Sequence, residues 1–300
     1  MLRALGLGDT LAAVPALRAL RAAVDHRIVL AGPADPGRLL VAEGLVDEIA
    51  STRGLADEPA VPRPDIGLNL HGSGPQSHRW LQATGPRRLV AFATPGVCGP
   101  KWDDDEHERA RWCRLVASGW GHEGDPDDVL LRHVVPAEQG PDVLVHPGAA
   151  SGARRWPAER WAAVARELAR DHGVGVTGSP AERRLASAVV AAAGLPESSS
   201  LAGDASLAQL AATIASARVL LCGDTGVAHL AYAVGTPAVV LFGPTPPRLW
   251  GPPATGRHVA VWRGDERRDP HAAEPDAQLL RITVDDVLEA TRDTLSHLPR

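Results

Sequence analysis

The polar residues that follow an apolar run near residue 222 have the types and spacing of an anion-binding site. The run at 219–222 predicts a buried parallel strand, and the residues after Thr225 predict a short helix that ends at Gly235. Open α/β sheets bind anionic ligands where a strand ends and a helix begins, because free N–H groups and the helix dipole point there. Thr225 and His229 lie four positions apart, so they share one helix face. The candidate residues of this segment are Asp224, Thr225, Gly226 and His229.

Two further polar clusters follow predicted strands in the same half of the chain. Arg154 and Arg155 lie in the loop after a strand predicted over 143–146, and Glu182 opens the helix after a strand predicted over 174–177. A cationic pair, helix N-termini and a carboxylate together suit a nucleoside diphosphate, with arginine on phosphate and glutamate on the ribose hydroxyls. Each residue also has a purely structural alternative: a solvated arginine pair, a carboxylate that complements a helix dipole, an N-cap aspartate or a packed histidine.

The first half of the chain offers one carboxylate on a tight glycine turn. This turn, residues 6–9, follows a strand predicted over 2–5, and Asp9 precedes a helix predicted over 10–23. The turn is not a dinucleotide-binding fingerprint, because the third small residue and the acidic ribose ligand are both missing. Asp9 is therefore either a chemical group or a helix cap. The strand predicted over 66–70 is followed by three candidates that could line the same cleft or lie on the surface: His71, His78 and Arg79.

Short apolar runs alternate with helical patterns along the chain, which predicts an α/β fold with parallel sheets and right-handed crossovers. Three hundred residues exceed the usual size of one domain, so we expect two. The proline-bounded segment 136–141 is the predicted linker, which gives domains over 1–138 and 139–300. A last helix predicted over 284–298 could pack back on the first domain, and the proline- and arginine-rich residues 251–278 predict a loop.

Composition and charge exclude several classes of protein. The net charge of −5 and the pI of about 6.2 argue against a nucleic-acid-binding surface. No apolar run reaches the roughly 18 residues of a membrane span, and three scattered cysteines with no leader pattern indicate a cytoplasmic protein. Four consecutive acids, residues 103–106, fall at the start of a helix predicted over 100–121. They point in different directions around it and have no histidine at ligand spacing, so we expect no metal site.

Several segments match the motifs of one enzyme family. Residues 6–17 match an opening with Gly-Asp and Pro-x-Leu, and residues 65–72 match a D-x-x-x-N-L-H-G strand. Residues 146–157 match H-P-G-A…K-R-W-P with arginine in place of the lysine. The most diagnostic matches are residues 224–231 and 241–245. On these segments, over nearly its whole length, the chain resembles glycosyltransferase family 9, the heptosyltransferases that use ADP-heptose.

The resemblance implies a GT-B fold: two Rossmann-like domains that face a central cleft, with the acceptor in the N-terminal domain and the donor in the C-terminal domain. It implies an inverting transfer, without metal or cofactor, from a nucleoside-diphosphate sugar, ADP-heptose first, to a glycan, glycolipid or small-molecule hydroxyl, and it allows peripheral membrane contact. The family's catalytic aspartate corresponds to Asp9, its nucleotide-contacting glutamate to Glu182, and its phosphate-binding lysine to Arg154, which keeps the charge but changes the group. The family's donor contacts correspond to Asp224, Thr225, Gly226 and His229.

Two other functions fit the same architecture. A sugar-nucleotide epimerase would need further acid–base carboxylates around the sugar, and only Asp9 stands out in the sequence. A non-catalytic sugar-nucleotide binder would not need Asp9 beside a complete set of donor residues. An epimerase would form a new sugar from the donor alone, whereas a transferase would hydrolyse the donor only slowly.

Overall fold

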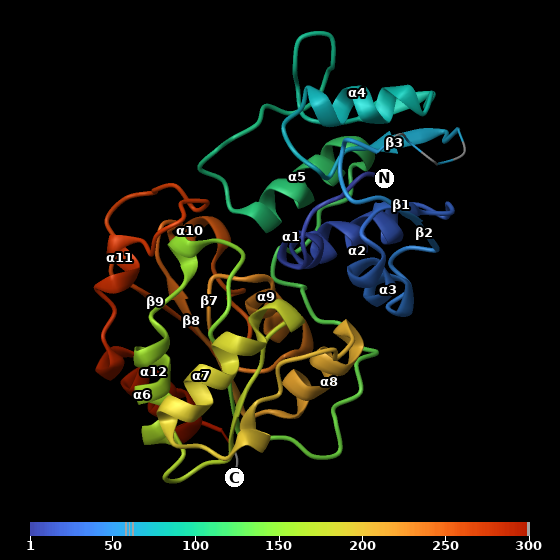
Figure 1. Ribbon diagram of the computed structural model, residues 1–300. Coiled ribbons are helices and arrows are strands. Elements are labelled where there is room, and N and C mark those ends of the chain that lie inside the picture. The colour runs from blue at the N-terminus through green and yellow to red at the C-terminus, as the bar shows by residue number, and fades with distance from the viewer. Residues whose placement is uncertain (58, 60, 62, 299–300) are drawn as a thin grey trace. The chain divides into compact units, whose positions relative to one another are not determined.

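The computed structural model describes residues 1–57, 59, 61 and 63–298. Contacts divide the chain into two compact units, Met1–His133 and Val134–Arg300, each built from helices and short parallel strands (Figure 1). The division falls a few residues before the proline-bounded segment that we predicted as a linker.

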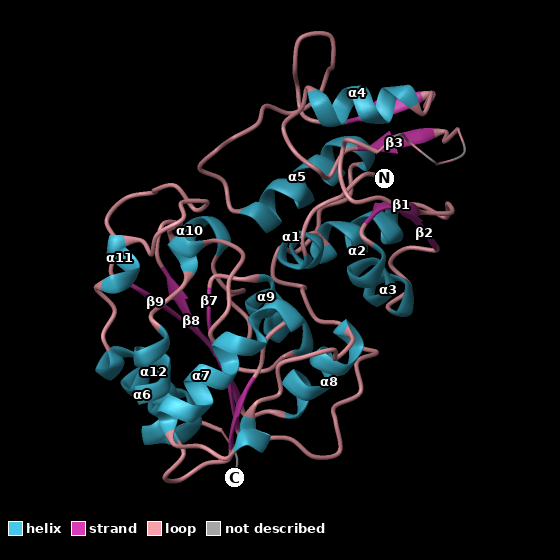
Figure 2. Ribbon diagram, viewed as in Figure 1, coloured by secondary structure: helices cyan, strands magenta, loops and turns pink. Residues whose placement is uncertain are grey.

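The C-terminal unit is built on a five-stranded parallel sheet within the described residues 134–298 (Figure 2). Its strands lie in the order β6-β5-β7-β8-β9. Every residue of β5, β7 and β8 is buried, as expected for strands covered on both faces. The strands are β5 (Val143–His146), β6 (Val174–Val176), β7 (Val219–Gly223), β8 (Ala238–Phe242) and β9 (His258–Trp262).

Helices cover both faces of this sheet. The apolar face of α6 packs with those of α7 and α12 in one core, and α8 packs beside α9. Gly235 ends α9 in a left-handed conformation, φ 75°, which an L side chain rarely adopts. The helices are α6 (Ala158–Leu168), α7 (Arg183–Ala193), α8 (Leu207–Ser216), α9 (Gly226–Val234), α10 (Pro247–Trp250), α11 (Ala277–Leu280) and α12 (Val284–Ser296).

One expectation about this unit was wrong. Residues 251–278 are not all loop, because His258–Trp262 forms the edge strand β9 and α11 closes the segment. The alternation of Val259 and Val261 marks that strand, and the surrounding prolines and arginines conceal it.

The helix α12 begins with a capping box. The Thr283 hydroxyl accepts from the Asp286 amide at 3.1 Å, and the Asp286 carboxylate accepts from the Thr283 amide at 2.8 Å. Its buried residues Val287, Leu288 and Leu295 belong to the core with α6, so its apolar face is occupied within the C-terminal unit.

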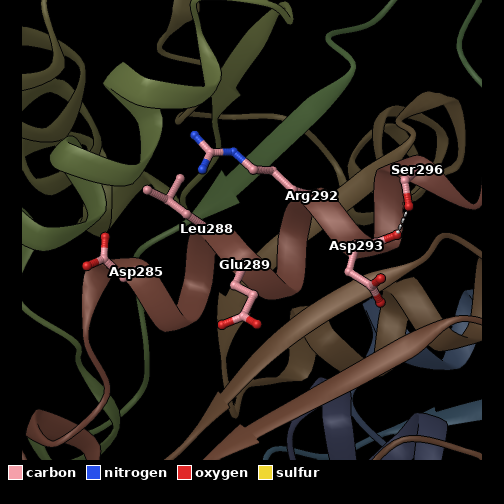
Figure 3. Close-up of a pocket in the computed structure, with 6 residues that line it drawn as sticks. All are labelled: Asp285, Leu288, Glu289, Arg292, Asp293 and Ser296. Carbon is pink, nitrogen blue, oxygen red and sulfur yellow. Dashed lines mark hydrogen bonds between the residues drawn. The ribbon is translucent and has the colours of Figure 1, made fainter.

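Replacing Thr283 with Ala is expected to lower the free energy of unfolding by about 0.5–2 kcal/mol, because the cap bond to the Asp286 amide is lost. Chemical denaturation measures the change. Ser296→Ala, at the far end of the same helix, is the control, because that hydroxyl caps no amide of the first turn: it bonds the Asp293 carbonyl at 2.8 Å (Figure 3) and His297 Nδ1 at 3.2 Å. If both substitutions lowered the free energy of unfolding equally, the capping box would stabilise α12 no more than the hydroxyl of Ser296 does.

The same box gives an expected dependence on pH. A hydrogen bond from Arg263 holds the pKa of Asp286 down to about 2, below the usual 3.8. A carboxyl whose folded pKa is depressed stabilises the protein above its unfolded pKa and loses that contribution as the pH falls through the folded value. The contribution of Asp286 should therefore be complete above about pH 4 and disappear toward pH 2, and Asp286→Asn should remove this part of the pH dependence in denaturation curves.

The N-terminal unit contains two parallel strand pairs, β1-β2 and β3-β4, within its described residues. Leu2 joins the pairs through bridges to Ala31 and Asn69. The strand predicted over 2–5 is thus reduced to one bridging residue between β1 and β3. The strands are β1 (Val29–Gly32), β2 (Glu48–Ser51), β3 (Ile66–Leu68) and β4 (Arg88–Val90).

Two predicted helices of this unit have different bounds. The helix predicted over 10–23 begins earlier and divides at Ala13, where α1 ends and α2, with Pro15 in its first turn, begins. The helix predicted over 100–121 begins only at Glu108, so the acids at 103–106 lie in a preceding turn rather than on a helix. The helices are α1 (Leu7–Ala12), α2 (Val14–Ala23), α3 (Ala34–Ala42), α4 (Gln76–Ala83) and α5 (Glu108–Trp120). Among the described residues, no helix is long and apolar enough to cross a membrane.

Candidate functional site

The strand order of the C-terminal sheet creates one position where loops diverge. The chain passes from β5 to β6 on one side, and β7 then lies on the other side of β5. Ligands of open α/β sheets bind at the carboxyl ends of strands at such a switch point. His146, the last residue of β5, is paired with Cys222 of β7, so the loops after these strands start side by side.

Arg154 connects the loops on the two sides of this switch point. It ends the short 3₁₀-helix η1 (Gly152–Arg154), and its Nη1 donates to the Asp224 carbonyl at 3.2 Å. Its Nε donates to the Ser151 hydroxyl at 3.3 Å. A Cβ on Gly223 would lie 2.9 Å from the Arg154 carbonyl oxygen, so the end of β7 approaches this loop closely. The half-buried guanidinium is thus fixed where β5 and β7 end.

Arg155 has a different environment. Its side chain is exposed, and its Nε donates to the Ala149 carbonyl at 2.9 Å. Its charge acts on Glu182, whose pKa it helps to lower. Of the two neighbouring arginines, Arg154 therefore bonds the loop after β7, whereas Arg155 bonds its own loop.

Residues 263–276 form a strap that hydrogen-bonds to the loop after β5, which carries Arg154. The Ala153 amide donates to the Ala272 carbonyl at 2.9 Å, and the Asp276 amide donates to the Ala153 carbonyl at 3.2 Å. A Cβ on Gly152 would lie 1.5 Å from a strap carbonyl oxygen, so only glycine fits there. The strap was not predicted as part of the site, because its composition indicates only a loop.

Glu182 lies at the end of the loop after β6. Its carboxylate accepts from the Ser179 amide at 2.9 Å and from the Ser179 hydroxyl at 2.8 Å, which fixes its direction. It lies directly against the backbone of Gly148, where an added Cβ would be 2.0 Å from Oε1. Burial acts to raise the pKa of Glu182, but the hydrogen bonds from Ser179 hold it below its usual range. This partly exposed group is therefore a charged acceptor beside the loop after β5.

His146 lies beside this carboxylate. The imidazole is buried, with Nδ1 3.0 Å from the Thr177 hydroxyl and Nε2 4.0 Å from Glu182 Oε2. Burial lowers the pKa of His146, so the ring is neutral near pH 7. His146 was noted in the sequence only as part of a motif, because a histidine that ends an apolar strand gives no sign of its partners.

The residues after β7 form the third side of the site. Thr225, not Asp224, is the N-cap of α9, and its hydroxyl accepts from the Val227 amide at 3.3 Å. Asp224 still belongs to the strand end, where its amide donates to the Leu241 carbonyl at 3.1 Å. Gly226 opens the helix, so the amide groups of the first turn and the positive end of the helix dipole lie here.

His229 lies one turn into α9 and is 6% exposed. Its ring is 5.5 Å from that of Tyr232 and 5.8 Å from that of Trp250. These edge-to-face contacts hold the imidazole in an aromatic cluster one turn after the N-terminus of α9.

In the N-terminal unit, Asp9 lies in the first turn of α1, with Gly6 as the N-cap. The turn follows the segment that lies between β1 and β3, and so stands at the carboxyl end of that sheet. The Asp9 side chain is 33% exposed, and burial of the rest of the group raises the pKa of Asp9 above the usual 3.8. An accessible carboxylate of raised basicity is suited to accept a proton.

The three other candidates of this unit lie in different environments. His71 lies beside the segment that precedes α1, since its Nδ1 accepts from the Ala4 amide at 3.2 Å, and burial lowers the pKa of His71 to about 4. His78 is 1% exposed and bonds Thr94 at 3.1 Å, which is the environment of a packed histidine. Arg79 is exposed on α4.

Comparison with known proteins decides the family. The profile of glycosyltransferase family 9 (heptosyltransferase) matches residues 117–279, more than half of the chain. The chain belongs to glycosyltransferase family 9. A search of curated proteins found no significant match.

Solved structures show the same fold for this family 9 glycosyltransferase. A glycosyl transferase family 9 protein from Veillonella parvula DSM 2008 has a TM-score of 0.78 at 19% identity, over 99% of this chain and 96% of that one. The E. coli ADP-heptose lps heptosyltransferase II has a TM-score of 0.75 at 20% identity, over 98% and 97%. The E. coli heptosyltransferase WaaC with ADP has a TM-score of 0.70 at 17% identity, over 98% and 98%. The fold is GT-B, as the motifs had indicated.

Two surface depressions of the glycosyltransferase do not mark this site. One of about 570 Å³ lies along α12, where three acidic side chains outnumber Arg292 and would repel a diphosphate (Figure 3). Another, of about 490 Å³, is lined by Val29 and Ile66, which begin β1 and β3. It therefore lies at the amino ends of those strands, opposite to the end where such sheets bind ligands.

Proposed function

We propose that the chain is an inverting, metal-independent glycosyltransferase that moves a heptose-like sugar from a nucleoside-diphosphate sugar, ADP-heptose first, to a hydroxyl of a glycan, glycolipid or small-molecule acceptor. The observation that carries the proposal is the meeting of three loops at the β5/β7 switch point. A guanidinium, a helix N-terminus and a fixed carboxylate come from three separate segments: Arg154, Thr225–Gly226 and Glu182.

These groups match the parts of a nucleoside diphosphate. The Arg154 guanidinium and the amide groups of the first turn of α9 supply positive potential for the two phosphates. Glu182, with its pKa held low, offers charged oxygens to the ribose hydroxyls. As the bond to the sugar breaks, negative charge grows on the leaving diphosphate, and the same donors stabilise it more strongly.

Asp9 is the proposed base. It takes the proton of the acceptor hydroxyl as that oxygen attacks the anomeric carbon, and the carbon–oxygen bond to the diphosphate breaks. Displacement from the side opposite the leaving group inverts the anomeric carbon. The raised pKa of Asp9 supports this role, because a more basic carboxylate binds the transferred proton better.

Transfer is expected to continue in EDTA at an unchanged rate. In the proposed site, Arg154 and the N-terminus of α9 supply the positive potential that other transferases take from a divalent cation. Among the described residues, no group of three or more His, Cys, Asp or Glu side chains could hold a metal ion. The measurement is release of ADP from ADP-heptose before and after chelation. Loss of activity that Mg²⁺ or Mn²⁺ restores would contradict metal independence.

Incubation of ADP-heptose with the protein and no acceptor tests the proposed reaction class. A transferase should release ADP slowly by hydrolysis and leave the remaining sugar nucleotide unaltered, as seen by NMR of the sugar. Appearance of an isomeric ADP-sugar would instead identify an epimerase. A donor that binds but is never consumed, with or without glycan acceptors, would identify a non-catalytic binder.

A further inference from the structure

A buried arginine, Arg3, bonds the turn that carries the proposed base, Asp9. Arg3 is 1% exposed, and its Nε donates to the Asp9 carbonyl at 2.6 Å. Its Nη1 donates to the Leu70 carbonyl, which precedes His71, and its guanidinium lies 4.6 Å from the ring centre of Trp112. One side chain therefore ties the turn that carries Asp9 to the end of the strand segment after β3.

Arg3 has two carboxylates within reach, and it bonds the more distant one in sequence. Its Nη2 donates to Glu108 Oε1 at 3.2 Å, whereas the same nitrogen is 4.0 Å from Asp9 Oδ1. Both partners of the Arg3–Glu108 pair are buried, at 1% and 5% exposed, so solvent screens their attraction little.

Glu108 is held firmly in this place. Its Oε1 also accepts from Trp112 Nε1 at 2.7 Å, and its Oε2 accepts from Arg111 Nη1. Glu108 is the first residue of α5, and it does not reach the surface. A buried carboxylate that bonds two arginines and an indole fixes the direction in which Arg3 points.

Two charged side chains act on the pKa of Asp9. Arg3 acts to lower the pKa of Asp9 and Glu108 acts to raise it, after burial, which raises it most. His71 has a pKa lowered by burial to about 4 and so carries no charge near pH 7.

Two helices that pack against α1, α2 and α3, carry charged groups that pair elsewhere. On α3, Asp35 forms an ion pair with Arg38. On α2, Arg18 pairs with Glu43 at 3.1 Å and Arg21 with Asp47 at 2.8 Å.

We propose that Glu108 is a positioning residue for Asp9: by holding the Arg3 guanidinium, it prevents that cation from pairing closely with the Asp9 carboxylate and so keeps Asp9 able to take up a proton. The part that concerns catalysis rests on the proposed role of Asp9. A carboxylate in close contact with a buried guanidinium would be stabilised in its charged form and would be a poor base. With Glu108 in place, Arg3 keeps a paired carboxylate when Asp9 becomes neutral.

Glu108→Gln tests the proposal directly. The amide keeps the shape of the side chain but removes the negative charge, and Arg3 then acts on Asp9 unopposed. NMR titration of ¹³C-labelled aspartate, with Asp9→Asn to assign the signal, should show Asp9 titrating at a lower pH in Glu108→Gln than in the unaltered protein. Glu106→Gln is the matched control: it removes a carboxylate two positions away that pairs with Arg114 at 2.6 Å, and Asp9 should titrate as before.

The rate of ADP release from ADP-heptose gives a second readout. Its acid limb should move to lower pH in Glu108→Gln, and the plateau should fall by less than the loss expected for Asp9→Asn, because a weaker base remains. Glu108→Asp keeps a counter-charge for the buried arginines and shortens the reach to Arg3, so it should shift the titration in the same direction even if the glutamine variant does not fold. An unchanged Asp9 titration in the variants that fold would overturn the proposal. Absence of ADP release from the unaltered protein would instead refute the proposed reaction, and the NMR titration would still decide the role of Glu108.

Discussion

Replacement of Asp9 by Asn is expected to slow sugar transfer by about 10²–10⁴-fold, the usual contribution of a positioned base, while the affinity for ADP stays nearly unchanged. Asn keeps the size of the side chain and its place in the first turn of α1, but it cannot accept the acceptor's proton. The donor groups lie on other elements, Arg154, Glu182 and α9, so the substitution does not touch them. Steady-state rates of ADP release and calorimetric titration with ADP measure the two quantities.

Asp35→Asn is the matched control for this experiment. Asp35 is also an acid in the first turn of a helix of the same unit, α3, and differs from Asp9 in being exposed. If Asp9 only complements a helix dipole, the two substitutions should have the same small effect on stability and none on rate. If Asp9→Asn kept more than about a tenth of the turnover, Asp9 would only complement the helix dipole and would not be the base.

Arg154→Ala is expected to weaken ADP binding by about 10–100-fold and to slow transfer as well. A charge-assisted hydrogen bond to phosphate contributes roughly 1.5–3 kcal/mol, and its strength should increase as the diphosphate leaves. The substitution also removes the bond to the Asp224 carbonyl, which joins the loops after β5 and β7. Calorimetry with ADP measures the affinity, and single-turnover rates measure the effect on the chemical step.

Arg155→Ala is the control, because it removes the same charge one position along. Its side chain is exposed and bonds only within its own loop at Ala149, so ADP affinity should change much less. Loss of affinity in Arg155→Ala with none in Arg154→Ala would exchange the roles of the two arginines. No change in either would move the phosphate site to the start of α9, at Thr225 and Gly226.

The parts of the fold that follow from local patterns were predictable. The apolar runs that became β5 and β7 are buried at every residue, and Gly235 ends α9 in the left-handed conformation that favours glycine. Because parallel strands end at one edge of the sheet, the loops that carry Arg154 and Thr225 could be placed together from the sequence. Their direct connection, from Arg154 to the Asp224 carbonyl, needed the structure.

The start of α5 shows where local reasoning failed. Residues 100–107 are rich in charge and read as helix, but the Asp103 side chain accepts from the Asp105 amide and favours a turn instead. Trp102 packs against Phe92, with ring centres 5.0 Å apart, so its position is set by a distant contact. The true N-cap is His107, an uncommon capping residue that composition does not reveal.

Long-range pairs of charges were equally hidden. Arg3 lies in a short apolar run, and its partner Glu108 is more than a hundred positions away. The apolar neighbours of Arg3 indicate burial, and the i,i+3 spacing indicates Arg111 as a partner of Glu108, but nothing in the sequence indicates that Arg3 and Glu108 pair. A sequence can thus nominate a reacting group such as Asp9 from a turn, whereas the charges that control its basicity appear only when the chain is folded.

Thermal unfolding with a panel of ADP-, GDP-, UDP- and TDP-sugars tests most directly whether a nucleoside-diphosphate sugar is the substrate. A ligand at 100 times its Kd stabilises the folded protein by about 2.7 kcal/mol, which raises the melting temperature clearly. We expect ADP-heptose and ADP to raise the melting temperature and Arg154→Ala to weaken the response. A panel in which no nucleotide sugar stabilises the protein, or in which Arg154→Ala responds like the unaltered chain, would contradict the donor site proposed at the β5/β7 switch point.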